Sequence, residues 1–131
     1  MIAVDANVVL RLLANDDAAQ AAKARKLFDA MATSDASIWI SDTVLVEVVW
    51  TLARAYGHAG TALVVAVRAL LQNATVAFES AHAVQAALVM FEAGPADFAD
   101  CLLVAKAKDA GCDEVLTFDR KMGTLPGVKL L

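Results

Sequence analysis

The sequence predicts an α/β fold with three layers, α/β/α, around a short and mostly parallel sheet. Short, nearly all-apolar segments alternate with longer segments of helical periodicity. These apolar segments contain almost no polar residues, which is typical of strands buried on both faces. Strands separated by helices need right-handed crossovers, which place helices on both sides of a sheet. The 131 residues fit one domain, so we expect a single domain over 1–131.

The first part of the chain is predicted to fold as strand, helix, helix and strand. Residues 2–5 are a short apolar strand. A helix begins near Asn7 and pauses around residues 15–17, where three polar residues follow one another. A second helix covers 18–32, because apolar residues recur near one helical face. Residues 38–41 form the second predicted strand.

The middle of the chain is predicted to contain three helices and one strand. Residues 41–43 supply Ser, Asp and Thr as helix-capping side chains, and Gly57 stops the helix that follows them. Further helices are expected over 60–71 and 80–92, with a strand over 75–78 between them.

The last part is predicted to fold as helix, strand, a short turn of helix and an edge strand. Pro95 suits the first turn of a helix that continues to Gly111. Residues 114–118 form a strand that leads into Asp119, and residues 128–131 form the edge strand.

Composition and charge limit the class of protein. Apolar residues make up 60% of the chain, above the usual 45–50% or so, and Ala and Val account for much of the excess. This favours tight helix packing or a large partner surface. No apolar run approaches the roughly 18 residues that span a bilayer, and no signal segment is evident, so a cytoplasmic protein without a membrane partner is expected. Cys101 and Cys112 match no zinc-site spacing.

The net charge of −4 argues against broad electrostatic capture of nucleic acid. It leaves RNA open as a substrate, because acids that hold a metal ion count as negative in this sum.

Acidic residues follow two predicted strands. Asp5 ends the first strand, and Asp119 ends the strand over 114–118. In a parallel sheet both carboxylates lie at the edge where ligands bind. Taken singly, each could equally be a cap of the next helix.

Three further acids lie on predicted helices. Glu47 stands in an apolar segment with no Lys or Arg three or four residues away. Its burial would be costly unless it is paired or bound to a metal, although a position facing solvent or a distant arginine partner stays open. Asp97 and Asp100 are three residues apart, so they share a helix face, and Asp97 suits a cap.

Acids from separate elements could meet at one edge of the sheet, and such a cluster needs a counter-charge. No His or Cys cluster accompanies them, so oxygen ligands and a hard cation, Mg²⁺ or Mn²⁺, are indicated. Such ions can activate water and neutralise charge on a phosphodiester that is being cleaved.

Four segments of the chain resemble the PIN-domain ribonucleases, specifically the VapC-type toxins of type II toxin–antitoxin pairs. The resemblance extends from residue 2 to about residue 128. The matching segments, in the order in which that family has them, are Ile2–Asn7, Ile40–Glu47, Ala96–Asp100 and Leu116–Arg120.

The resemblance implies a PIN-like fold and cleavage of single-stranded or looped RNA. It implies a homodimer and a VapB-type antitoxin partner as well. It places Asp5, Glu47, Asp100 and Asp119 on the acidic quartet that coordinates Mg²⁺ or Mn²⁺ and carries catalysis. Asp97 falls on an auxiliary acidic position, and Asn7 and Thr117 fall where polar side chains support the acids.

Cationic side chains near these segments are candidates for contacts with RNA phosphates, with ordinary surface charge as the alternative. They are Arg11, Arg54, Arg120 and Lys121. His58 and His82 are expected to be surface or capping residues, and Trp39 and Trp50 to be core or dimer contacts.

Two other functions stay open. One is an aspartyl-phosphate phosphatase with Asp5 as nucleophile, which the Asn at position 7 weakens because such enzymes often place a second acid there. The other is a module of the same fold that binds RNA or a partner without catalysis.

Overall fold

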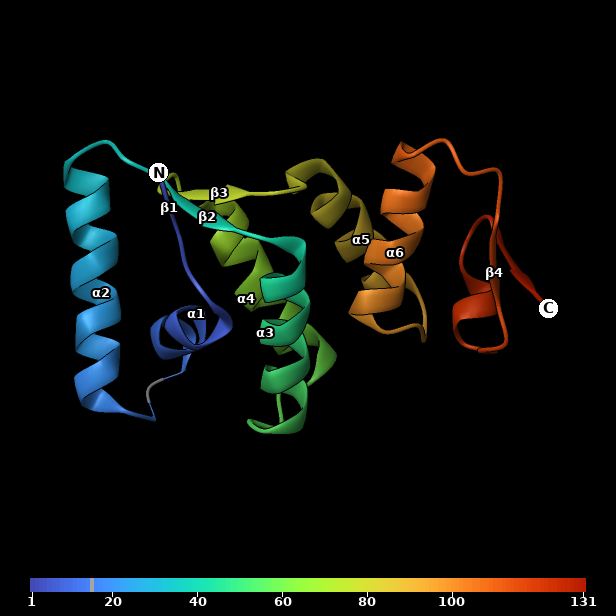
Figure 1. Ribbon diagram of the computed structural model, residues 1–131. Helices are drawn as coiled ribbons and strands as arrows, with labels where there is room; N and C mark the ends of the chain where they lie inside the picture. Colours follow the sequence, from blue (N-terminus) through green and yellow to red (C-terminus); the bar gives the residue numbers. More distant parts are fainter. Residues whose placement is uncertain (15) are drawn as a thin grey trace. The chain divides into compact units, whose positions relative to one another are not determined.

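The computed structural model describes residues 1–14 and 16–131 (Figure 1). The chain divides into two compact units, Met1–Glu79 and Ser80–Leu131, and each is described by itself. Asn15, within the predicted pause between the first two helices, lies outside the described residues.

The first unit combines three parallel strands with four helices. The strands hydrogen-bond in the order β1-β2-β3, so β2 is central, and Ile38 of β2 pairs with Ile2 on one side and Val76 on the other. Along the chain the elements are β1 (Ile2–Ala3), α1 (Ala6–Leu13), α2 (Ala18–Thr33), β2 (Ile38–Ile40), α3 (Asp42–Arg54), α4 (Gly60–Gln72) and β3 (Val76–Phe78).

Local capping sets where three of these helices begin. A side-chain oxygen of the residue before each helix accepts a hydrogen bond from a backbone amide of the first turn, which has no partner within the helix. Asp5 caps α1, Asp17 caps α2 and Ser41 caps α3. Gly57 has φ +66°, a conformation that favours glycine, and it follows the end of α3 as predicted.

The core of the first unit joins helix faces to the central strand. Helix α1 packs against both α2 and α3, and α3 packs against α4 (Figure 1). Side chains with no exposed surface come from α1, α2, β2 and α3, and they are Val9, Ala21, Ile38, Ile40 and Leu45. In β2, Trp39 is half-buried between two fully buried isoleucines, which agrees with its entirely apolar sequence.

The second unit consists of a helix pair and a two-stranded parallel ladder. Its elements are α5 (Ala81–Ala93), α6 (Phe98–Asp109), β4 (Val115–Thr117), the 3₁₀ turn η1 (Met122–Thr124) and β5 (Val128–Leu130). Helices α5 and α6 pack along each other, and the rings of Phe91 and Phe98 meet edge to face with centroids 6.2 Å apart. Strand β4 pairs with β5, which follows it through η1.

The predicted α/β class with short parallel strands is confirmed. Two local expectations differ from the structure. Helix α6 begins at Phe98, three residues later than Pro95 suggested, because Asp97 supplies the cap. Ser80, the first residue of the predicted helix over 80–92, precedes α5 and makes no side-chain capping hydrogen bond. Within the described residues, no helix has both the length and the apolar character that crossing a membrane requires.

Candidate active site

Asp5 lies between β1 and α1 with its carboxylate exposed. Its Oδ1 accepts a hydrogen bond from the backbone N–H of Val8 at 3.1 Å, so the position is fixed by the start of the helix. Among the described residues, none donates a hydrogen bond to the other carboxylate oxygen of Asp5. Asn7, one of the predicted supporting residues, is exposed in the first turn of α1. The capping role considered for Asp5 is therefore real, and it leaves acceptor capacity for a ligand.

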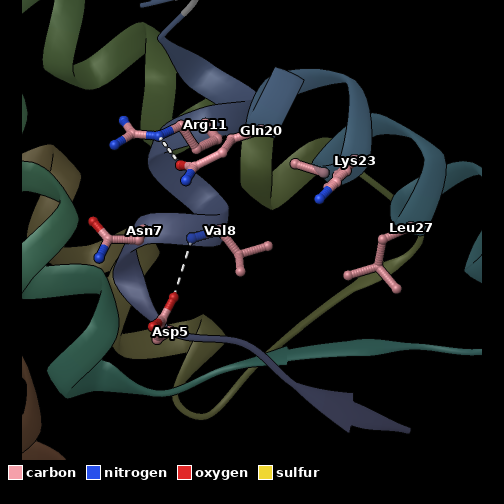
Figure 2. Close-up of a pocket in the computed structure, with 8 residues that line it drawn as sticks. Asp5, Asn7, Val8, Arg11, Gln20, Lys23 and Leu27 are labelled. Carbon is pink, nitrogen blue, oxygen red and sulfur yellow. Dashed lines mark hydrogen bonds between the residues drawn. The ribbon is translucent and has the colours of Figure 1, made fainter. Parts of the chain in front are cut away.

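A cavity of about 350 Å³ lies beside Asp5, between α1 and α2 (Figure 2). It is lined by Asp5, Asn7, Val8, Arg11, Gln20, Lys23, Ala24 and Leu27. Sequence reasoning did not single out Gln20 or Lys23. The signal available was their spacing, since residues 20, 23, 24 and 27 share one face of α2.

Arg11 is held by its neighbours within the first unit. Its Nε donates to Gln20 at 2.7 Å, and its Nη1 donates to Asp16 and to the Tyr56 hydroxyl, both at 3.1 Å. Tyr56 in turn donates to Asp16 at 2.5 Å, and this hydrogen bond lowers the pKa of Asp16. The guanidinium thus links α1 to the start of α2 and the end of α3, which makes it a poor candidate for a phosphate contact.

Glu47 lies on the exposed side of α3, so of the positions left open for it the structure has the one that faces solvent. Thr43, Glu47, Trp50 and Arg54 recur at intervals of four, three and four residues, and all four are exposed. Trp50 has 61% of its surface exposed, which excludes the core position considered for it. Within the described residues, no ion pair joins Glu47 to Arg11 or Arg54.

Two acids of the second unit are held by local hydrogen bonds. Asp97 caps α6, its Oδ1 accepting from the N–H of Asp100 at 2.8 Å, as expected for an acid in this position. The Oδ1 of Asp119 accepts from the amides of Lys121 and Met122 at 2.8 and 3.0 Å. The N–H of Asp119 donates to Oγ1 of Thr117 at 3.0 Å, so Thr117 fixes the backbone that carries this acid.

Asp100 is half-buried on α6, and its environment disfavours its negative charge. Burial, the neighbouring charge of Asp97, a hydrogen bond with that side chain and the charge of Asp119 together raise the pKa of Asp100. The charges of Asp97 and Asp119 therefore both act on the carboxyl group of Asp100. A divalent cation that prefers oxygen ligands, such as Mg²⁺ or Mn²⁺, would offset this unfavourable interaction.

Asp5 and Glu47 belong to the first unit, and Asp100 and Asp119 belong to the second. Within neither unit do three or more described His, Cys, Asp or Glu residues form a group that could hold a metal ion. Arg120 and Lys121 are exposed directly after Asp119, and Arg54 is exposed at the end of α3.

Comparison with known proteins identifies a family. The family model described as PIN domain matches residues 2–127. No curated protein matches the chain. Among solved structures, the chain is similar to a crystal structure of the Mycobacterium tuberculosis toxin VapC20, which is described as cleaving the sarcin-ricin loop. The identity is 24% over 98% of this chain and 97% of that chain, with a TM-score of 0.45.

Proposed function

The chain belongs to the PIN-domain family, and from this premise we propose that it is a metal-dependent endoribonuclease that hydrolyses RNA phosphodiester bonds. The observation that carries the proposal is that the family match contains four acids in the order and spacing of the resemblance. They are Asp5, Glu47, Asp100 and Asp119. We propose that residues 1–131 act as one nuclease domain that needs all four.

The four acids have related roles in this proposal. Their carboxylates bind a divalent cation, with Asp97 as an auxiliary ligand. When bound, such a cation would activate a water and offset charge on the phosphate. Asn7 and Thr117 support the acids from neighbouring positions. The environment of Asp100 supports this role, because a carboxyl group whose pKa is raised by neighbouring acids gains from a cation.

The RNA backbone needs positive charge near the acids. We propose Arg54, Arg120 and Lys121 as phosphate contacts, because all three are exposed. Arg11 has its guanidinium engaged by Asp16, Gln20 and Tyr56, so we assign it to holding α1 in place.

We further propose that the protein is a VapC-type toxin that forms a homodimer and is neutralised by a VapB-type antitoxin. The four segments that resemble such toxins support the activity and the antitoxin partner. Exposed apolar side chains on α3 and α4, Trp50 at 61% and Val65 at 66%, support a protein partner on the first unit.

Cleavage of a total RNA pool by the purified protein tests the proposal. We expect cleavage with Mg²⁺ or Mn²⁺ and none with EDTA. Each of Asp5→Asn, Glu47→Gln, Asp100→Asn and Asp119→Asn should slow cleavage by about 100-fold or more. The Asn variants at positions 5 and 119 keep an oxygen that can accept the amide hydrogen bonds described above, so the folds of these variants should persist.

The matched control is Asp35→Asn, the same change at an exposed turn residue whose φ of +54° asparagine tolerates. It should cleave RNA at the wild-type rate. Cleavage that survives both EDTA and Asp5→Asn would overturn the metal-dependent mechanism. RNA binding without cleavage under any metal would favour a binding module instead.

A further inference from the structure

We propose that the cavity between α1 and α2 is a subsite for one RNA nucleotide next to the bond that is cleaved. Lys23 binds its phosphate, and the apolar wall made by Val8, Ala24 and Leu27 receives its base and ribose. This inference rests on the proposed function, and it assigns a role to residues outside the acidic quartet.

Charge distinguishes Lys23 from the other cation of the cavity. Arg11 is neutralised by Asp16, with which it forms an ion pair at 3.1 Å. Lys23 is exposed on α2, and within the described residues no ion pair engages it. The lining therefore carries an unpaired ammonium, Lys23, on the α2 side and a carboxylate, Asp5, at the start of α1, so a phosphate is favoured on the α2 side of the cavity.

The shape of the cavity fits a nucleotide. Its volume of about 350 Å³ lies at the lower end of the range of small-ligand sites, roughly 300–1,000 Å³. Val8 and Leu27 are half-buried and Ala24 is buried, so the wall between the polar residues is apolar. Figure 2 shows Val8 on the α1 side and Lys23 and Leu27 extending from α2.

The position of Asp5 connects this cavity to the chemistry. Asp5 lines the same cavity as Lys23 and is one of the four acids proposed to act on the phosphodiester. A strand whose scissile phosphate lies at Asp5 would place an adjacent nucleotide in the cavity. A protein segment could also enter an apolar groove, but the free ammonium of Lys23 favours the RNA backbone.

The test is equilibrium binding of a fluorescein-labelled, short single-stranded RNA in EDTA, where cleavage is not expected, measured across a salt series. Lys23→Ala should weaken binding about threefold or more and lower the slope of log K against log salt by about 0.7, the value for one phosphate contact on a single strand. Lys23→Arg should restore both.

Leu27→Ala removes apolar surface without changing charge. It should weaken binding while leaving the salt slope unchanged. The matched control is Lys26→Ala, which removes the same charge from an exposed position of α2 that does not line the cavity. It should change neither affinity nor slope. Melting curves of all variants establish that they are folded.

Equal losses for Lys23→Ala and Lys26→Ala would overturn the subsite, because they would show a diffuse charge effect. Wild-type RNA binding by Lys23→Ala and Leu27→Ala, with loss only of a co-purified protein partner, would overturn it in favour of a protein groove. In both cases metal-dependent cleavage by the wild type would remain, so the subsite can fail while the proposed function stands.

Discussion

The most extensive side-chain cluster among the described residues joins Arg11, Asp16, Gln20 and Tyr56. Its hydrogen bonds join residues that are separated along the chain, so they hold separate elements together. The largest separation is 45 residues, between Arg11 and Tyr56. Charged hydrogen bonds of this kind are stronger than neutral ones. The cluster therefore fixes the C-terminal end of α1, whose N-terminal end carries Asp5.

Tyr56→Phe should destabilise the protein at neutral pH and have less effect in acid. The Tyr56 hydroxyl lowers the pKa of Asp16, so this group stabilises the folded state above the ordinary value of 3.8 and loses that contribution as pH falls below it. Melting temperature measured across pH checks this. Asp16→Asn should behave alike, and the double variant should lose little more than either single variant. A decrease in melting temperature that is the same at all pH values would contradict the role of Asp16.

At the scale of single residues, the sequence predicted local capping better than the surroundings of each side chain. Asp97 could be recognised as a cap because capping depends on neighbours within three residues. Glu47 could not be placed correctly, since an apolar run such as Val44–Val49 does not show which helix face meets the core. The engagement of Arg11 depends on Tyr56, a contact no local pattern reveals.

Helix α3 carries Glu47, and its start depends on one side chain. The Oγ of Ser41 accepts from the N–H of Val44 at 3.0 Å. Ser41→Ala should cost about 1 kcal/mol of folding free energy, and urea unfolding measures it. Ser41→Asn should restore most of the loss, because asparagine caps as well as serine. Failure of this rescue would mean that Ser41 acts through packing instead.

Element boundaries could be predicted wherever local chemistry sets them, as at Asp5, Ser41 and Gly57. The pairing of the strands could not be predicted, because it depends on residues that are distant in sequence. The sequence indicated five strands, and the structure joins β1, β2 and β3 in one ladder and β4 and β5 in another. Both Pro95 and Asp97 suit the start of a helix, and the prediction chose Pro95. In the structure the side chain of Asp97 accepts the capping hydrogen bond, so α6 begins at Phe98.

At the scale of the whole molecule, metal binding should increase the thermal stability of the folded protein. Millimolar Mg²⁺ or Mn²⁺ should raise the melting temperature, since a ligand bound only by the folded state stabilises it. Asp119→Asn should abolish the rise while retaining the amide acceptor that orders η1. Differential scanning calorimetry with metal and with EDTA makes the comparison. An equal rise in wild type and variant would show that the cation binds elsewhere.

The exposure of Trp50 gives the protein an intrinsic optical signal on α3. Only two tryptophans occur, and Trp39 is half-buried in β2, so a Trp39→Phe protein would emit from Trp50 alone. A water-exposed indole emits at long wavelength, and covering it shifts the emission to the blue. Glu47 is one helical turn away on the same face. The wavelength of tryptophan fluorescence would therefore report when RNA or a protein partner covers that face, without any added label.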